Sequence, residues 1–267
     1  MGLAFPAADA KARDRLLKRM KSLIHVNDSE RAEVYRNLVS KAGPAIESLS
    51  AFETVFAKML ASNLSDSNPN DFIEILTEVR KDAEVSSEII EILAISEDKS
   101  RRLALPLSSD LAGSPLRSHA SYTRSEALVG LGYASNPTSH VAGVAWCEST
   151  KTDALFVTLN KTDRAFSPTT MYRDYALNEK MFHWESQNST RASSSTGQRY
   201  IHHADNHSNI VLFTRSTRAD NGITSTYTCL GNVSYVNHVG ERPMSITWEL
   251  ARPMPQQVYL EASTVAH

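Results

Sequence analysis

The spacing of apolar residues changes once along this chain, near residue 113, and the change restricts the folds open to it. Up to Ser100, apolar residues recur three or four positions apart, as they do on one face of a helix. Beyond Gly113, short apolar runs are separated by Asn, Asp, Gly and Pro, as in β-strands joined by turns. This pattern predicts an α+β protein with a helical domain at 1–113 and a β-rich domain at 114–267.

End signals accompany the helical spacing in the first part. Asp28 or Ser29 can cap one helix, Gly43 with Pro44 can end it, and Asn68 with Pro69 can open another. We therefore expect a compact bundle of about four or five short helices. The helical segments are 11–24, 28–43, 50–64, 68–83 and 86–96.

The second part begins with one more helical segment, "RSEALVGLG", which we expect to open the β-rich domain. The β-type runs after it are short, which favours a curved sheet or a partly closed barrel over a parallel sheet with intervening helices. The Ser-rich stretch 188–198 fits a mobile loop. The β-type runs are 140–150, 153–161, 199–205, 209–217, 224–239 and 244–251.

Composition excludes several classes of protein. No apolar run approaches the ~20 residues of a membrane span, so we expect a cytoplasmic protein with no membrane partner. Cys147 and Cys229 are too few for a disulfide framework, and we expect them to be reduced and buried. The net charge of −2 indicates no general affinity for polyanions, although a local basic patch can still bind nucleic acid.

The segment "FSPTTMYRDYALNEKMFHWESQN" (166–188) is the densest in aromatic and polar side chains. Phe182 and Trp184 alternate with His183, so in a strand the two rings share one face and either fill a core or hold a flat ligand. Several amide and hydroxyl groups follow at once, and each would cost about 1–3 kcal/mol if buried without a partner. Rings edged by amides are the groups with which proteins hold unpaired nucleobases.

Other chemistries fit the sequence less well. Glu185 and Gln187 of "WESQ" resemble the end of a metal-dependent nuclease site, with Asp153, Asp163 or Asp174 as the second carboxylate. In "YIHHADNH", adjacent histidines in a strand point to opposite faces, so a solvated turn is favoured over a metal site. The sequence has no phosphate-binding glycine loop, no nucleophile elbow and no zinc-deaminase pattern. It indicates no catalytic residues, metal or cofactor.

Four blocks of the sequence carry a resemblance to a known family. They resemble an uncharacterised domain family found at the C-terminal end of bacterial proteins that join a phospholipase-D-type nuclease to a DEAD/DEAH-type helicase. Some proteins of that architecture are modification-dependent (type IV) restriction enzymes, whose terminal domain is similar to SRA-type readers of 5-methylcytosine. The resemblance covers roughly residues 105 to 260, in the blocks "LRSHASYTRSEALVGLG", "DALFVTLNKTDRAFSPTTMYRDYALNEKMFHWESQNST", "TGQRYIHH" and "LGNVSYVNHVGERPMSITWEL".

The resemblance implies an SRA- or PUA-like module that flips a methylated cytosine of double-stranded DNA into an aromatic pocket. Helicase and nuclease domains, in cis or in trans, would do the cutting in a restriction or antiviral defence system. Such a module could also form a homodimer. Two other functions are alternatives to base recognition: a metal-dependent nuclease domain, or an assembly domain that binds no DNA. Side-chain chemistry selects the candidates: Tyr172, Tyr175, Phe182 and Trp184 for stacking, Gln187, Asn188 and Asn160 for the base edge, and Lys161, Arg173, Arg191, Arg199 and Arg215 for phosphates.

Overall fold

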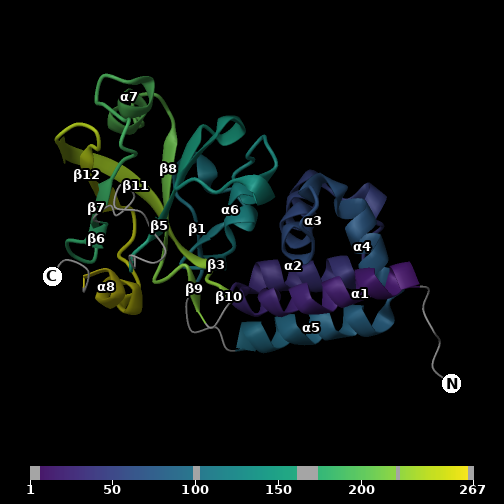
Figure 1. Cartoon of the computed structure of the whole chain (residues 1–267). Coiled ribbons are helices and arrows are strands. Elements are labelled where there is room, and N and C mark those ends of the chain that lie inside the picture. Colours follow the sequence, from purple (N-terminus) through teal and green to yellow (C-terminus); the bar gives the residue numbers. More distant parts are fainter. Residues whose placement is uncertain (1–6, 99–102, 161–173, 221–222, 264–267) are drawn as a thin grey trace. The chain divides into compact units, whose positions relative to one another are not determined.

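The computed structural model of the chain describes residues 7–98, 103–160, 174–220 and 223–263 (Figure 1). The chain divides into two compact units, each made of three separate stretches of sequence. No single boundary near Gly113 therefore separates them. The helical unit comprises Met1–Ala104, Ala120–Gly130 and Ser135–His140. The β unit comprises Leu105–His119, Leu131–Ala134 and Val141–His267.

The helical spacing of the first part is confirmed by five α-helices within residues 7–98. α2 packs against α3 and α5, α4 packs on α3, and α1 lies along α5 (Figure 1). Asp28 caps α2 as expected, because its Oδ1 accepts a hydrogen bond from the Arg31 amide at 3.0 Å. The helices are α1 (Ala7–Met20), α2 (Ser29–Val39), α3 (Ala51–Leu64), α4 (Phe72–Lys81) and α5 (Ala83–Asp98).

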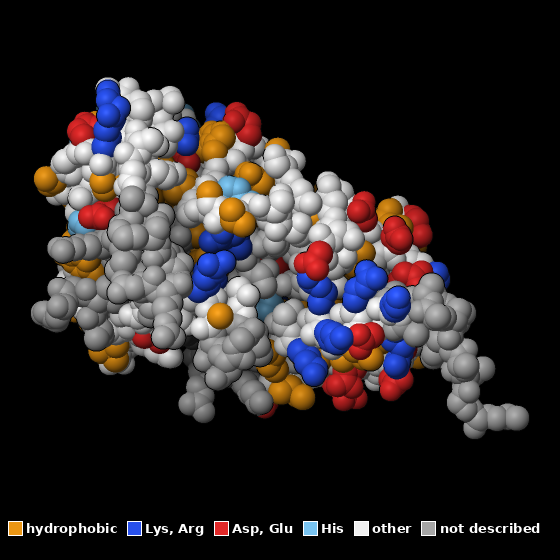
Figure 2. All heavy atoms as spheres, in the orientation of Figure 1, with side chains coloured by type: hydrophobic (Ala, Val, Ile, Leu, Met, Phe, Trp, Pro, Cys, Tyr) orange, Lys and Arg blue, Asp and Glu red, His pale blue; other side chains and the backbone are white. Residues whose placement is uncertain are grey.

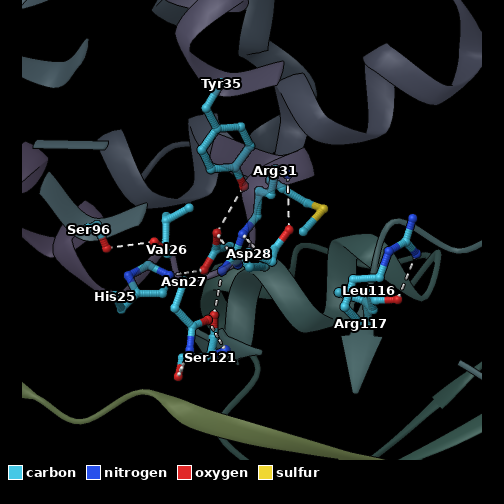
Figure 3. A network of polar contacts seen from close by, with 12 residues as sticks. His25, Val26, Asn27, Asp28, Arg31, Tyr35, Ser96, Leu116, Arg117 and Ser121 are labelled. Atoms are coloured by element: carbon cyan, nitrogen blue, oxygen red, sulfur yellow. Dashed lines mark hydrogen bonds and ion pairs between the residues drawn. The ribbon is translucent and has the colours of Figure 1, made fainter. Parts of the chain in front are cut away.

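A sixth helix, α6 (Arg124–Gly130), packs against α3 and belongs to the helical unit, so it does not open the β-rich domain as the sequence had indicated. A buried ionic network explains its position. The Arg31 guanidinium donates to the Glu126 carboxylate at 3.2 Å and to the Ser121 carbonyl at 2.8 Å. The Tyr35 hydroxyl also donates to Glu126, at 2.9 Å. Figure 3 shows Tyr35, Arg31 and Ser121 converging around this cluster.

The β unit is built on one mixed sheet with the strand order β4-β5-β8-β11-β12-β7-β6. β5 and β8 are parallel, and the other neighbours in this order are antiparallel. Because β4 and β6 end the order among the described strands, the sheet is open and is not closed into a barrel. Its strands are β4 (Val144–Cys147), β5 (Thr152–Thr158), β6 (Tyr175–Ala176), β7 (Met181–Glu185), β8 (Asn209–Arg215), β11 (Tyr227–Val239) and β12 (Ser245–Leu250).

Short strands and two further α-helices accompany the main sheet in the described part of the chain. β1 (Leu105–Pro106) pairs with β2 (Arg117–Ser118), and β9 (Ala219–Asp220) pairs with β10 (Ile223–Thr224). β3 (Ser121–Tyr122) lies in a segment of the helical unit. The helices of the β unit, α7 (Ser195–Ile201) and α8 (Gln256–Ser263), lie at opposite ends of its sheet (Figure 1). The α+β class expected from the sequence is therefore confirmed.

One face of the sheet is covered by a hydrophobic core. Phe182 and Trp184 of β7 lie beside Ile246 and Trp248 of β12, and Tyr200 of α7 packs on the two tryptophans. Residues 199–205, expected as a strand, instead form the end of α7 and a turn, so that prediction was wrong. Tyr200 reaches the core from a helix rather than from a strand.

Candidate nucleic-acid interface

Two loops leave the sheet at the same end, beside α7. Residues 186–194 follow β7, and residues 240–244 join β11 to β12. Glu185 is in register with Ser245, and Ser245 is in register with Val239, so both loops start from one row of the sheet. We call the surface formed by residues 186–194 and 240–244 the loop end.

Hydrogen bonds fix the two loops against each other. Each loop contributes both donors and acceptors to these bonds. The contacts are the Arg242 amide to the Thr190 carbonyl at 3.1 Å, the Ala192 amide to the Glu241 carboxylate at 2.9 Å, the Met244 amide to the Ser186 hydroxyl at 2.9 Å, and the Ser186 amide to the Met244 carbonyl at 3.0 Å. The loop end is therefore one structured surface.

Several predicted ligand-binding side chains lie on the loop end. Asn188 and Arg191 are exposed, and Gln187 is half-buried. The Gln187 Oε1 accepts hydrogen bonds from the Thr190 hydroxyl at 3.1 Å and from the Tyr200 hydroxyl at 3.3 Å. Both basic and acidic side chains reach the surface around α7 (Figure 2). The structure therefore brings three of the predicted polar contacts together.

The four-ring slot expected from the sequence does not form as predicted. Phe182 is 0% exposed and Trp184 is 4% exposed, and both belong to the core, so neither ring offers a face to a base. Tyr175 on β6 is half-buried and stacks on His183, with ring centroids 4.6 Å apart. Of the three rings that the structure describes, only that of Tyr175 reaches the surface. Tyr172 lies outside the described residues.

Four rings, of which three are buried and that of Tyr235 is half-buried, form a cluster around Trp248. The centroid of its ring lies 6.2 to 6.3 Å from those of Trp184, Tyr200, His203 and Tyr235. Burial lowers the pKa of His203 and so favours its neutral form. This neutral ring can accept from the Tyr235 amide at Nε2, at 3.1 Å, while Nδ1 lies 3.3 Å from the Ser208 carbonyl. The Tyr200 hydroxyl links this cluster to the loop end through its hydrogen bond to Gln187.

Arg199, which the sequence predicted to contact a phosphate, forms an internal ion pair and is only partly exposed. Its guanidinium donates to both carboxylate oxygens of Asp153, at 2.6 and 2.9 Å, and lies over the Trp146 ring at 4.5 Å. The hydrogen bond and charge of Asp153, which is 1% exposed, raise the pKa of Arg199. Arg199 therefore anchors α7 to β5.

Asn160 and Arg215 lie at the opposite end of the sheet from the loop end. They lie close together because β5 and β8 are parallel, with Thr158 at the end of β5 in register with Arg215 at the end of β8. Asn160 donates to the Ser216 hydroxyl at 3.1 Å, and Arg215 donates to the Thr158 hydroxyl at 3.0 Å. They cannot share one compact contact surface with Arg191, and Lys161 and Arg173 lie outside the described residues.

The groups proposed for a metal-dependent nuclease are only partly assembled. The Asp174 carboxylate accepts a hydrogen bond from the Glu185 amide at 3.0 Å, and Asp153 is paired with Arg199. Asp163 lies outside the described residues. Among the residues described, no three His, Cys, Asp or Glu side chains are grouped so as to hold a metal ion.

Two residues at or next to the loop end were not among the binding residues selected from the sequence, although Arg242 is one of the cations scattered over its second part. Arg242 is exposed at the β11–β12 turn, and Val239, which precedes the turn, has 73% of its surface exposed. The signal was present in "VGERP", where a glycine, a cation and a proline separate two β-type runs.

The β unit is an α+β module. It has an open mixed sheet, a helix at each end of that sheet and a polar loop surface. The chain belongs to the family described as "Domain of unknown function (DUF3427)", which matches residues 116–262. None of the curated proteins matches the sequence.

One solved structure that is similar to this chain is that of "The 5-Hydroxymethylcytosine-Specific Restriction Enzyme AbaSI". The identity is 11% and the TM-score 0.32, over 70% of this chain and 56% of that chain. This chain thus spans little more than half of that protein. A TM-score this low carries no conclusion about the function of the present chain. No helix in the described part of the chain is long and apolar enough to cross a membrane.

Proposed function

We propose that the β unit is a DNA-binding module that prefers duplexes with a modified, methylated cytosine, and that the loop end is its contact surface. The observation that carries the proposal is the hydrogen-bonded pairing of two polar loops, which holds Asn188, Arg191 and Arg242 on one exposed surface. Guanidinium groups bind phosphate and guanine with two parallel hydrogen bonds, and amides match the edges of bases. A surface that is already ordered loses little entropy on binding.

In this proposal the β unit supplies recognition without a catalytic site, metal or cofactor of its own. It is the specificity part of a bacterial, cytoplasmic restriction or defence system, with helicase and nuclease domains in cis or in trans and with room for self-association. Phe182 and Trp184 have no part in base binding, because their rings are packed in the core. Tyr175 and Gln187 remain candidates at the edge of the contact surface.

Binding of the full chain to one duplex carrying cytosine, 5-methylcytosine or 5-hydroxymethylcytosine tests the proposal, with fluorescence anisotropy as the readout. We expect measurable binding at low salt, a preference for a modified duplex, and a steep loss of affinity as salt rises. Arg191→Ala should weaken binding to all three duplexes by a similar factor and reduce the salt slope by about one.

Arg218→Ala is the matched control, because Arg218 is exposed beyond β8, at the end of the sheet opposite the loop end. Equal affinity for the three duplexes would remove the preference for modified cytosine. Absence of binding to any duplex at low salt would remove the proposal altogether.

A further inference from the structure

Arg242 occupies an unusual backbone position at the apex of the loop end. Its φ angle is +58°, in the left-handed region that residues with a Cβ atom rarely adopt. Its amide is held by the Thr190 carbonyl, and Gly240 in the same turn also has a positive φ of +75°. Within the described residues, the Arg242 guanidinium makes no hydrogen bond or ion pair. The fold thus holds a strained arginine whose exposed side chain is available to a ligand.

An exposed apolar side chain lies beside this arginine. Val239 is 73% exposed and is in register with Ser245, so these two residues flank the turn that carries Arg242. Val236, at the irregularity between Tyr235 and Asn237, is 41% exposed, and Asn237 is exposed as well. The end of β11 and the turn after it therefore present apolar, amide and guanidinium groups within a few residues.

These groups match one kind of ligand edge. In the major groove, a C·G pair presents O6 and N7 of guanine as acceptors, and a methyl group at C5 of the cytosine is exposed in the same groove. Arginine is the usual partner for the two guanine acceptors, and small apolar side chains contact pyrimidine methyl groups. The major groove is also wide enough to admit a β-ribbon.

Resting on the proposed DNA binding, we infer that the β11–β12 turn enters the major groove and reads a methylated C·G pair. Arg242 binds O6 and N7 of the guanine, and Val239 contacts the methyl group of the cytosine. The base stays in the duplex, which agrees with the packing of Phe182 and Trp184 in the core. The Glu241 carboxylate of the same turn accepts a hydrogen bond from the Ala192 amide, so it is partnered within the loop end.

Guanine N7 can be tested directly by replacing the guanine opposite 5-methylcytosine with 7-deazaguanine, which retains Watson–Crick pairing. We expect wild-type protein to lose roughly 10- to 100-fold in affinity for the 7-deazaguanine duplex, the value of one hydrogen bond from a charged donor. Arg242→Gly should bind both duplexes equally, and no more tightly than the wild type binds the 7-deazaguanine duplex. Because glycine suits a positive φ, this variant should melt at the same temperature as the wild type or higher.

The methyl contact is tested by Val239→Ser, compared with Val141→Ser at a position that is 84% exposed and outside the loop end. We expect Val239→Ser to abolish a preference for 5-methylcytosine over cytosine of about 4-fold, the value of one buried methyl-sized group. Val141→Ser should keep that preference.

The outcomes separate the inference from the proposal on which it rests. Binding that depends on Arg191 but is unaffected by 7-deazaguanine, with Arg242→Gly behaving as wild type, overturns the major-groove inference and leaves the DNA-binding proposal standing. Failure of the wild type to bind any duplex overturns both.

Discussion

The carboxylate of Glu126 lies 2.5 Å from Nε2 of His25, although the two residues are 101 positions apart in the sequence. Nδ1 of the same ring lies 2.5 Å from the Ser22 carbonyl, so both ring nitrogens face oxygen atoms. Arg31 also donates to Glu126, and all three side chains are buried. The position of α6 in the helical unit thus depends on a cluster of charges.

Acid should destabilise the helical unit through Glu126. Burial opposes its ionised form, but the charges of His25 and Arg31, with hydrogen bonds from His25 and the Thr123 amide, outweigh this and lower the pKa to about 2. Because the folded pKa lies below the ordinary value of 4.5, the stability from Glu126 is present above about pH 4.5 and is lost as the pH falls toward 2. The loss should reach about 3 kcal/mol. Urea unfolding followed by far-UV circular dichroism across this range measures it, and a flat profile would contradict the assignment.

Substitution of Glu126 should be far more damaging than substitution of a surface carboxylate. Glu126→Gln leaves the fully buried Arg31 with Asp28 as its remaining carboxylate, and removing one partner of a buried pair costs roughly 3–5 kcal/mol. Glu78→Gln is the control, because Glu78 forms an exposed pair with Lys81 and should cost less than about 1 kcal/mol. All three tryptophans lie in the β unit. Tryptophan fluorescence should therefore change less than circular dichroism, and equal unfolding midpoints for the two variants would refute this role of Glu126.

Local patterns predicted the helices well but could not predict which elements pack together. The spacing of apolar residues and the cap at Asp28 depend on neighbours within a few positions, and both were confirmed. The placement of α6 was wrong because the partners of Glu126 lie about a hundred residues away. Similarly, Tyr200 and Ile201 look like strand residues, but Ser194 accepts from the Gly197 amide at 3.1 Å and starts a helix.

The candidate site shows the same limit. Alternation around His183 correctly placed Phe182 and Trp184 on one face of a strand, and that face is buried. Which face is buried is decided by β12, where Ile246 and Trp248 are paired with Trp184 and Phe182. The clustering of Gln187, Asn188 and Arg191 was predictable because they are neighbours in sequence. The contribution of Arg242 depends on a loop pairing that only the fold reveals.

Gly197 should be essential for the loop end. A Cβ atom at this position would lie 1.9 Å from the Arg191 carbonyl oxygen, so α7 and the loop 186–194 would have to separate. We expect Gly197→Ala to destabilise the β unit by about 1–3 kcal/mol, as overpacking does, and to weaken DNA binding. The measurement is urea unfolding followed by tryptophan fluorescence. Gly113→Ala is the control, since its Cβ would meet nothing within 4 Å; a shared midpoint would show that α7 adapts to the added methyl group.

Both cysteines should be unreactive in the folded protein. Burial raises the pKa of Cys147 to about 12, with a further contribution from Asp153, and burial raises the pKa of Cys229 to about 12 as well. At pH 8 the thiolate fraction is then about one part in ten thousand, too small for appreciable reaction with a disulfide reagent. Reaction should therefore require opening of the sheet.

The two thiols should nevertheless differ in the rate at which they become accessible. Cys147 lies on β4, which ends the strand order, whereas Cys229 lies on β11, inside the strand order, in register with Phe213 of β8. Terminal strands open more often than central ones, so alkylation should label Cys147 first in dilute urea, while Cys229 follows global unfolding of the β unit. Mass spectrometry of labelled peptides measures the order, with Cys147→Ser identifying the slow phase. Fast labelling of Cys229 in the absence of urea would show that the centre of the sheet opens, contrary to its packing.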